Sequence, residues 1–272
     1  MSLVKKIILL VSVSAVIACV AFWSYLGRHY VVPVLMYHSV NPVPNPEIRS
    51  LIVSPRTFEK QMHFLRAHNY HIVSLEELGR LIKDKARIPR NTVAVTFDDG
   101  YKDNYTYAFP VLKKYSIPAT IFIIINEVGR PLTKELKPGD ARLSWQEIKE
   151  MRSSGLIDFG SHTLGAEPLV DKKTDAALKE QIVDSKAFLE ARLGERVDIF
   201  SYPGGLFNDK IKRMVKDAGY FCAVATSPGA RFSDDDPFII KRVRVSENAQ
   251  NLFIFWWDLS GYYLYFKEKR RK

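Results

Sequence analysis

Residues 93–100 read Val-Ala-Val-Thr-Phe-Asp-Asp-Gly, a run of strand-forming residues that ends in two carboxylates and a glycine. A strand of this composition is buried, so Asp98 and Asp99 lie where it emerges at the edge of a sheet. Two adjacent carboxylates are costly without a positive charge beside them, and a divalent metal is the usual one. Because successive strand residues point to opposite faces, we expect one aspartate to bind the metal and the other to accept a proton. The alternative for this run alone is a strand closed by an Asp-Gly turn.

Strands and helices alternate on both sides of this run. Further strand patterns cover residues 31–37, 117–124, 156–162, 198–202, 220–225 and 238–245, and helices are expected to begin near residues 54, 74, 103, 144, 174 and 208. Strands separated by helices indicate βαβ units and a parallel sheet. About seven such units favour an α/β fold that closes as a distorted (β/α) barrel over an open sheet.

The composition is that of a folded protein in anionic surroundings. The chain has 272 residues, of which 47% are apolar and 26% charged, and a formal net charge of +10. Such a charge favours nucleic acid, anionic lipid or an anionic cell envelope as the environment. No nucleic-acid motif and no basic strip interleaved with aromatic residues is present, so we predict an envelope location and no nucleic-acid partner. The oligomeric state is not predicted.

The N-terminus predicts a membrane anchor. Lys5 and Lys6 precede the uncharged residues 7–27, a stretch long enough to span a bilayer as a helix. The paired lysines put the N-terminus in the cytoplasm and the remainder outside it, as a single-pass protein of the cell membrane. A cleaved signal peptide and a lipoprotein modified at Cys19 are the alternatives. We therefore divide the chain into an anchor (1–29), a barrel domain (30–246) and a C-terminal segment (247–272).

Residues of reactive type recur at the ends of the predicted strands. His38, Asp98, Asp99, His162 and the turn at residues 202–205 each follow a strand. In a (β/α) barrel the chemistry gathers at the carboxyl ends of the strands. Their shared position favours a functional site over five unrelated loops.

These motifs resemble the polysaccharide deacetylase family, carbohydrate esterases that share the NodB homology domain. The resemblance covers roughly residues 31–245, and TFDDG at residues 96–100 matches the first family motif in full. Ser-His-Thr at 161–163 matches the start of the second motif, and residues 33–40, 144–155 and 200–205 are similar to other family segments. The resemblance implies a hydrolase that removes N-acetyl groups from amino sugars of an extracytoplasmic polysaccharide or peptidoglycan-like glycan.

The resemblance also implies roles for individual residues. Asp98 would be the general base, and Asp99 and His162 would bind a divalent metal, for which zinc is the expected choice. Such a metal suits amide hydrolysis, because it polarises the carbonyl and sharpens the attacking water. Backbone N–H groups around Tyr202, Pro203 and Gly204 would stabilise the oxyanion.

The sequence departs from the family pattern at three positions. Ala166 stands where the second metal-binding histidine is usual, and Glu167 and His38 are the candidate substitutes. No histidine follows His162, which leaves His38 as the candidate general acid. Where some members carry an arginine in the Pro-Gly loop, this chain has Ser201, and Arg242 or Arg244 is the candidate replacement for that charge.

These departures leave two interpretations. One is an active deacetylase with a remodelled site. The other is an inactive, carbohydrate-binding or scaffold protein of the envelope that keeps the fold. A glycoside hydrolase is disfavoured, because Asp98 and Asp99 diverge to opposite faces and cannot flank a glycosidic oxygen.

The C-terminal segment is dense in aromatic residues. Aromatic and aliphatic residues fill 252–257 and 262–266, and residues 267–272 are mostly basic. The segment is expected to pack on the barrel as a last helix. The alternative is an interfacial segment that lies on the membrane with its basic end near anionic headgroups.

Overall fold

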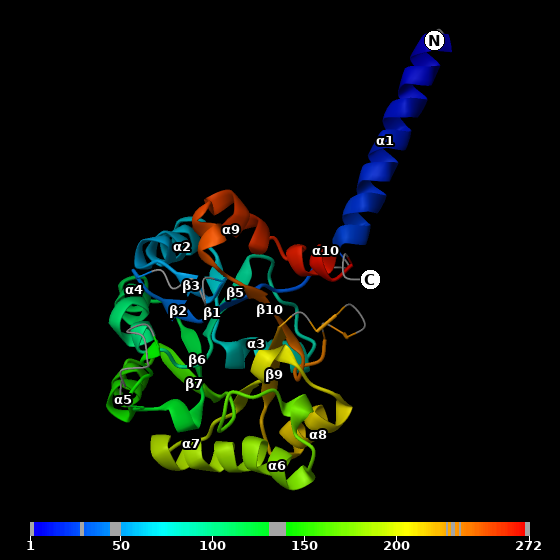
Figure 1. Cartoon of the computed structure of the whole chain (residues 1–272). Helices are drawn as coiled ribbons and strands as arrows, with labels where there is room; N and C mark the ends of the chain where they lie inside the picture. The colour runs from blue at the N-terminus through cyan, green and yellow to red at the C-terminus, as the bar shows by residue number, and fades with distance from the viewer. Residues whose placement is uncertain are drawn as a thin grey trace.

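The computed structural model describes residues 3–27, 30–43, 50–130, 140–226, 228–229, 232–233 and 235–269. Within these residues seven parallel strands close into a barrel (Figure 1). The ring is closed because β1 pairs with both β10 and β5. Its strands are β1 (Val34–Tyr37), β5 (Thr92–Phe97), β6 (Ala119–Ile123), β7 (Ile157–Ser161), β8 (Ile199–Ser201), β9 (Cys222–Thr226) and β10 (Ile240–Arg244). The predicted barrel of about seven units is confirmed.

Three short strands lie outside the closed ring. β4 (His71–Ile72) pairs with the start of β5, outside the closed ring. β2 (Ser39–Val40) and β3 (Ile52–Val53) form a separate parallel ladder directly after β1. The pattern did not predict them, because two-residue strands carry too few side chains to show a period.

Alternation along β5 determines what each face of the strand meets. Val93, Val95 and Phe97 pack in the layer between the barrel and its helices. Ala94 packs in the barrel interior with Phe122. The period of two therefore directs Thr96 and then Asp98 into the barrel.

Helices cover the barrel and are capped as their sequences indicate. Ser54, Ser74, Thr174 and Asn208 each accept a hydrogen bond from a backbone N–H in the first turn, and Ser144 forms a full capping box with Glu147. The helices are α2 (Pro55–Ala67), α3 (Leu75–Lys83), α4 (Phe109–Lys114), α5 (Trp145–Ser153), α6 (Asp175–Lys179), α7 (Ser185–Leu193) and α8 (Asp209–Asp217). Single π-helical turns precede α4 (Asn104–Ala108) and α7 (Glu180–Asp184).

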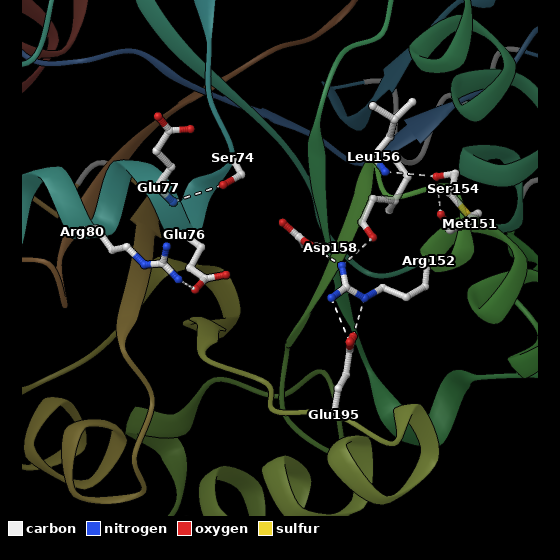
Figure 2. A network of polar contacts seen from close by, with 11 residues as sticks. Ser74, Glu76, Glu77, Arg80, Met151, Arg152, Ser154, Leu156, Asp158 and Glu195 are labelled. Atoms are coloured by element: carbon white, nitrogen blue, oxygen red, sulfur yellow. Dashed lines mark hydrogen bonds and ion pairs between the residues drawn. The ribbon is translucent and has the colours of Figure 1, made fainter.

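A charged network fastens the amino end of β7. Arg152 on α5 bonds Asp158 at the start of β7 and Glu195 in the loop after α7 (Figure 2). In Figure 2 the Ser74 cap of α3 lies near the same end of the barrel. This end is opposite the carboxyl ends of the strands, so the network holds the fold together and is not part of a site there.

The N-terminal helix α1 (Leu3–Gly27) leads away from the barrel (Figure 1). Its large apolar side chains from Val4 to Phe22 are exposed along the described part of the helix. Within the residues that the structure describes, no helix is long and apolar enough to cross a membrane.

The C-terminal segment forms two short helices that pack on the domain. They are α9 (Leu252–Asp258) and α10 (Tyr263–Lys269), after a 3₁₀ turn at Glu247–Gln250. Phe255 of α9 is buried against Phe64 of α2, and Leu264 of α10 joins the main core. One face of the segment therefore packs as expected, as two helices rather than one.

Candidate active site

The side chains singled out in the sequence lie at one end of the barrel. His38 follows β1, Asp98 and Asp99 follow β5, His162 follows β7, and the Pro-Gly turn follows β8. All these strands are parallel, so their carboxyl ends share one end of the barrel. Arg242 reaches the same place from inside β10.

Asp98 and Arg242 form a buried, two-pronged ion pair. Both carboxylate oxygens of Asp98 accept from the guanidinium, Oδ1 from Nη1 and Oδ2 from Nη2, each at 2.7 Å. Arg242 also donates to Thr96 Oγ1 at 3.3 Å and to Ser201 Oγ at 3.0 Å. Burial alone would raise the pKa of Asp98, but Arg242, with His162 adding less, holds it well below its usual range. Asp98 is therefore a fixed, ionised acceptor at neutral pH.

Asp99 and His162 face each other beside that pair. His162 Nε2 lies 3.5 Å from Asp99 Oδ1, and His162 Nδ1 lies 2.9 Å from the Ser201 carbonyl oxygen. A carbonyl can only accept, so Nδ1 carries a proton, and in the neutral ring Nε2 offers a lone pair. That lone pair faces a carboxylate oxygen, an arrangement that a cation between the two would stabilise.

Asp99 has an unusual backbone conformation. Asp99 has φ of +69°, in the left-handed region that side chains other than glycine adopt at a cost. Its side chain keeps 20% of its surface exposed, so it lies at the mouth of the barrel, whereas Asp98 is enclosed. The two aspartates thus differ in environment, as the sequence predicted. Strained backbone at such a position is typical of functional sites.

His38 is buried next to these groups. Its Nδ1 has no hydrogen-bond partner among the described residues, and Asn104 Nδ2 holds its carbonyl oxygen at 2.8 Å. Burial lowers the pKa of His38, and the carboxylates of Asp98 and Asp99 oppose that shift. The ring is therefore mainly neutral at pH 7.

The donor set fits a divalent cation only in part. Asp99 and His162 are a carboxylate and an imidazole of the kind that zinc binds. No group of three or more His, Cys, Asp or Glu side chains able to hold a metal occurs among the described residues. Neither predicted substitute, Glu167 or His38, completes the set.

Residues 166 and 167 face solvent. Ala166 is exposed, and Glu167 is 66% exposed and lies 3.4 Å from the Lys172 ammonium. Gln181 stabilises this conformation of the loop after β7, because its Oε1 accepts a hydrogen bond from the Gly165 N–H at 3.0 Å. Neither Ala166 nor Glu167 therefore adds a ligand to the Asp99–His162 pair in this structure.

The Pro-Gly turn offers one backbone donor among the three predicted residues. The Tyr202 N–H donates to the Val224 carbonyl at 3.2 Å, and Pro203 has no N–H. Gly204, with φ of +63°, remains as the candidate oxyanion donor. The Tyr202 ring stacks on Phe207 at 4.7 Å and contributes to packing.

Sequence reasoning missed the residues that position the named ones. Ser201 was noted only as an absent arginine, yet its hydroxyl contacts Arg242 and its carbonyl contacts His162. Asp103, buried beside β2, accepts from Ser39 Oγ and the Val40 N–H. Its place four residues after Asp99 was the available signal, since a further carboxylate beside a buried strand end requires partners.

Comparison with known proteins gives concordant matches. The polysaccharide deacetylase model matches residues 85–223. Poly-beta-1,6-N-acetyl-D-glucosamine N-deacetylase of Staphylococcus epidermidis is 34% identical over 221 residues, which cover 78% of this chain and 74% of that protein. Among solved structures, the Streptococcus pyogenes deacetylase PplD in complex with acetate has a TM-score of 0.71 and 28% identity, covering 82% of this chain and 97% of that one. IcaB from Ammonifex degensii has a TM-score of 0.71 and 29% identity, covering 84% and 97%.

Proposed function

Because this chain belongs to the polysaccharide deacetylase family, we propose that it hydrolyses N-acetyl groups on the amino sugars of a polysaccharide at the Asp98–Arg242 site. One observation carries the proposal: a fixed, ionised carboxylate lies beside an Asp99–His162 pair that suits a cation. These are the two components that metal-assisted amide hydrolysis needs.

Asp98 is suited to accept the proton of the attacking water. Both its oxygens are held by Arg242, so its orientation is set before substrate arrives. Arg242 stabilises the ionised form, which keeps Asp98 ready as a base but also makes it a weak one. When bound, a divalent cation such as zinc would polarise the acetyl carbonyl and make the water more acidic.

Asp99 and His162 are the residues that would hold this cation. The hydrogen bond from His162 Nδ1 to the Ser201 carbonyl orients the ring with Nε2 toward Asp99. Metal-binding histidines are commonly oriented by such a hydrogen bond from the second ring nitrogen. The Gly204 N–H is the candidate donor to the oxygen that becomes negative in the reaction.

His38 is our candidate for the proton donor to the leaving amine. As water adds and the C–N bond breaks, acetate forms and the sugar nitrogen takes up a proton. His38 is neutral at pH 7 in the resting site, so it would take up the proton that Asp98 removes from the water and deliver it to the sugar nitrogen.

The substrate class and the location are parts of the same proposal. A relative that acts on poly-beta-1,6-N-acetyl-D-glucosamine supports an N-acetylated glucosamine polymer, and a peptidoglycan-like glycan is the other candidate. The net charge of +10 supports an anionic envelope. The paired lysines before the apolar N-terminal stretch support attachment to the cell membrane with the barrel outside the cytoplasm.

The test is acetate release by the purified full chain. Oligomers of β-1,6-linked N-acetylglucosamine, chito-oligosaccharides and peptidoglycan fragments would be compared, with and without added zinc. Asp98→Asn is expected to lower kcat by about 10²- to 10⁴-fold, as loss of a general base does. Exposed Asp84→Asn is the matched control and keeps full activity. No acetate from any of these glycans, in the presence of zinc, would refute the proposal.

A binding protein without turnover is the second candidate. The exposed Ala166 and the incomplete ligand set favour it. In that case the wild type and the Asp98→Asn variant would bind these glycans with equal affinity, and neither would release acetate. A wild type that releases acetate excludes it.

A further inference from the structure

The C-terminal helices α9 and α10 present an apolar surface that the barrel leaves uncovered. Phe253 is 71% exposed, Trp256 47% and Trp257 39%, and Leu252, Ile254 and Phe266 are exposed beside them. We refer to these six residues as the aromatic face. A contiguous exposed set of large apolar side chains indicates a contact surface rather than chance exposure.

The aromatic face adjoins the foot of α1. Tyr25, near the end of α1, has its hydroxyl 2.5 Å from that of Tyr265, and Lys269 Nζ reaches the Tyr25 hydroxyl at 3.2 Å. In Figure 1 α10 lies at the point where α1 leaves the domain. The exposed apolar side chains of α1 and the aromatic face therefore meet at one place on the molecule.

The turn between α9 and α10 is held firmly against the chain that follows α1. Gly261 has φ of +76°, and a side chain there would collide with the Tyr30 ring. The Gly261 carbonyl accepts from the Val31 N–H at 2.8 Å. The aromatic face is thus a built surface with a fixed position.

A hollow of about 460 Å³ lies between these elements. Its lining includes Phe22, Tyr30, Arg90, Trp256, Trp257 and Phe266. Aromatic rings with one basic group at the rim suit an apolar chain that ends in an anionic headgroup.

The acidic side chains of α9 and α10 are buried, whereas a basic side chain is exposed. The two acidic residues of α9 and α10, Asp258 and Glu268, are buried, and Glu268 is 3.0 Å from the Lys241 ammonium inside the domain. Lys269 is exposed, and the sequence continues Arg270, Arg271, Lys272. The described outer side of α9 and α10 therefore presents positive charge without an exposed carboxylate.

From this juxtaposition we infer that the aromatic face rests in the headgroup region of an anionic lipid bilayer. Tryptophan and tyrosine favour that region because their rings are apolar and their tips polar. Basic residues beside them gain from anionic headgroups. Contact of this kind lies in the plane of the surface and needs no helix that crosses the bilayer. The inference is independent of the deacetylase activity.

Quenching of tryptophan fluorescence by lipid tests this contact in the full chain. In Trp23→Phe/Trp145→Phe the only remaining tryptophans are Trp256 and Trp257. The protein is combined with vesicles of phosphatidylglycerol and phosphatidylcholine whose acyl chains carry bromine, a contact quencher. We expect at least about twofold stronger quenching than in a control whose reporter lies on another face, and a loss of the difference in pure phosphatidylcholine.

The control reporter matches the exposure of Trp257. Phe188 on α7 is 40% exposed, and α7 lies on the side of the barrel away from α9 in Figure 1. The control is Phe188→Trp with all four native tryptophans changed to Phe; since Trp145 contacts Phe188, this exchanges two neighbouring rings. Circular dichroism confirms that both proteins are folded.

Equal quenching at the two reporters would overturn the inference. Acrylamide protection of Trp256 and Trp257 that grows with protein concentration, without lipid, would also overturn it, because a second copy would then cover the face.

Discussion

Replacing Arg242 with methionine tests how much the buried ion pair with Asp98 contributes to the stability of the fold. Arg242 is fully buried and gives four hydrogen bonds, two of them to Asp98. Removing one partner of a buried pair leaves the other charge without compensation, at a cost of about 3–5 kcal/mol. We expect the free energy of unfolding at pH 7 to fall by that amount, or Tm by about 6–20 °C.

The pH dependence gives the signature of this mechanism. In the wild type the folded pKa of Asp98 is depressed, so the pair contributes its full stability above about pH 4, the unfolded pKa, and loses it as pH falls through the lower folded pKa. In Arg242→Met burial raises the folded pKa above the unfolded one. The variant is then penalised as pH rises, so the difference between the two proteins shrinks from pH 7 toward pH 4.

Urea unfolding followed by circular dichroism at pH 7, 5.5 and 4.5 measures both effects. Arg244→Met is the control, because Arg244 ends the same strand and is exposed, and it should change stability by less than about 0.5 kcal/mol. Adding Asp98→Asn to Arg242→Met should recover part of the loss at pH 7, since an amide is cheaper to bury than a lone carboxylate. A difference between wild type and Arg242→Met that is constant with pH would refute the reasoning.

Three further predictions concern the turn, the metal and the C-terminus. Gly205→Ala should lower the free energy of unfolding in urea by about 2 kcal/mol or more, because Gly205 has a positive φ and the added Cβ would lie 2.6 Å from a backbone nitrogen of β9. The control is Gly194→Ala, which also has a positive φ but lies in open space and should lower it by about 1 kcal/mol. Ala166→His should tighten zinc binding in calorimetry by at least about tenfold if the loop lets the ring reach the Asp99–His162 pair, and an unchanged affinity would show that it does not. Glu268→Gln should cost about 3–5 kcal/mol, because it leaves Lys241 charged and buried, and a loss below 1 kcal/mol would contradict that burial.

The strands were predictable because each one repeats a strong local signal. Seven apolar runs bounded by turn residues became the seven strands of the ring, and the parallel order followed from the helices between them. The residues at their ends were predictable for the same reason: topology places every carboxyl end together, whatever the details of packing.

The partners of those residues were not predictable, because they depend on how far each strand reaches along the barrel. Arg242 and Arg244 lie two apart and share a face of β10, so period alone cannot choose between them. Arg242 falls level with Asp98, and Arg244 falls beyond the buried part of the strand. A third metal ligand could not be predicted for a similar reason: Glu167 follows Ala166 in sequence, but the course of the loop places its side chain in solvent near Lys172.

Two adjacent residues of β10 connect the site to the C-terminal segment. Arg242 points inward to Asp98, and its neighbour Lys241 points outward to Glu268 of α10, as alternation requires. Both pairs are buried, so each must stay formed for the strand to keep both charges compensated. The strand that orients the proposed base is therefore the strand on which the aromatic face is anchored. A barrel held at a lipid surface by that face would have its orientation set through the same two residues.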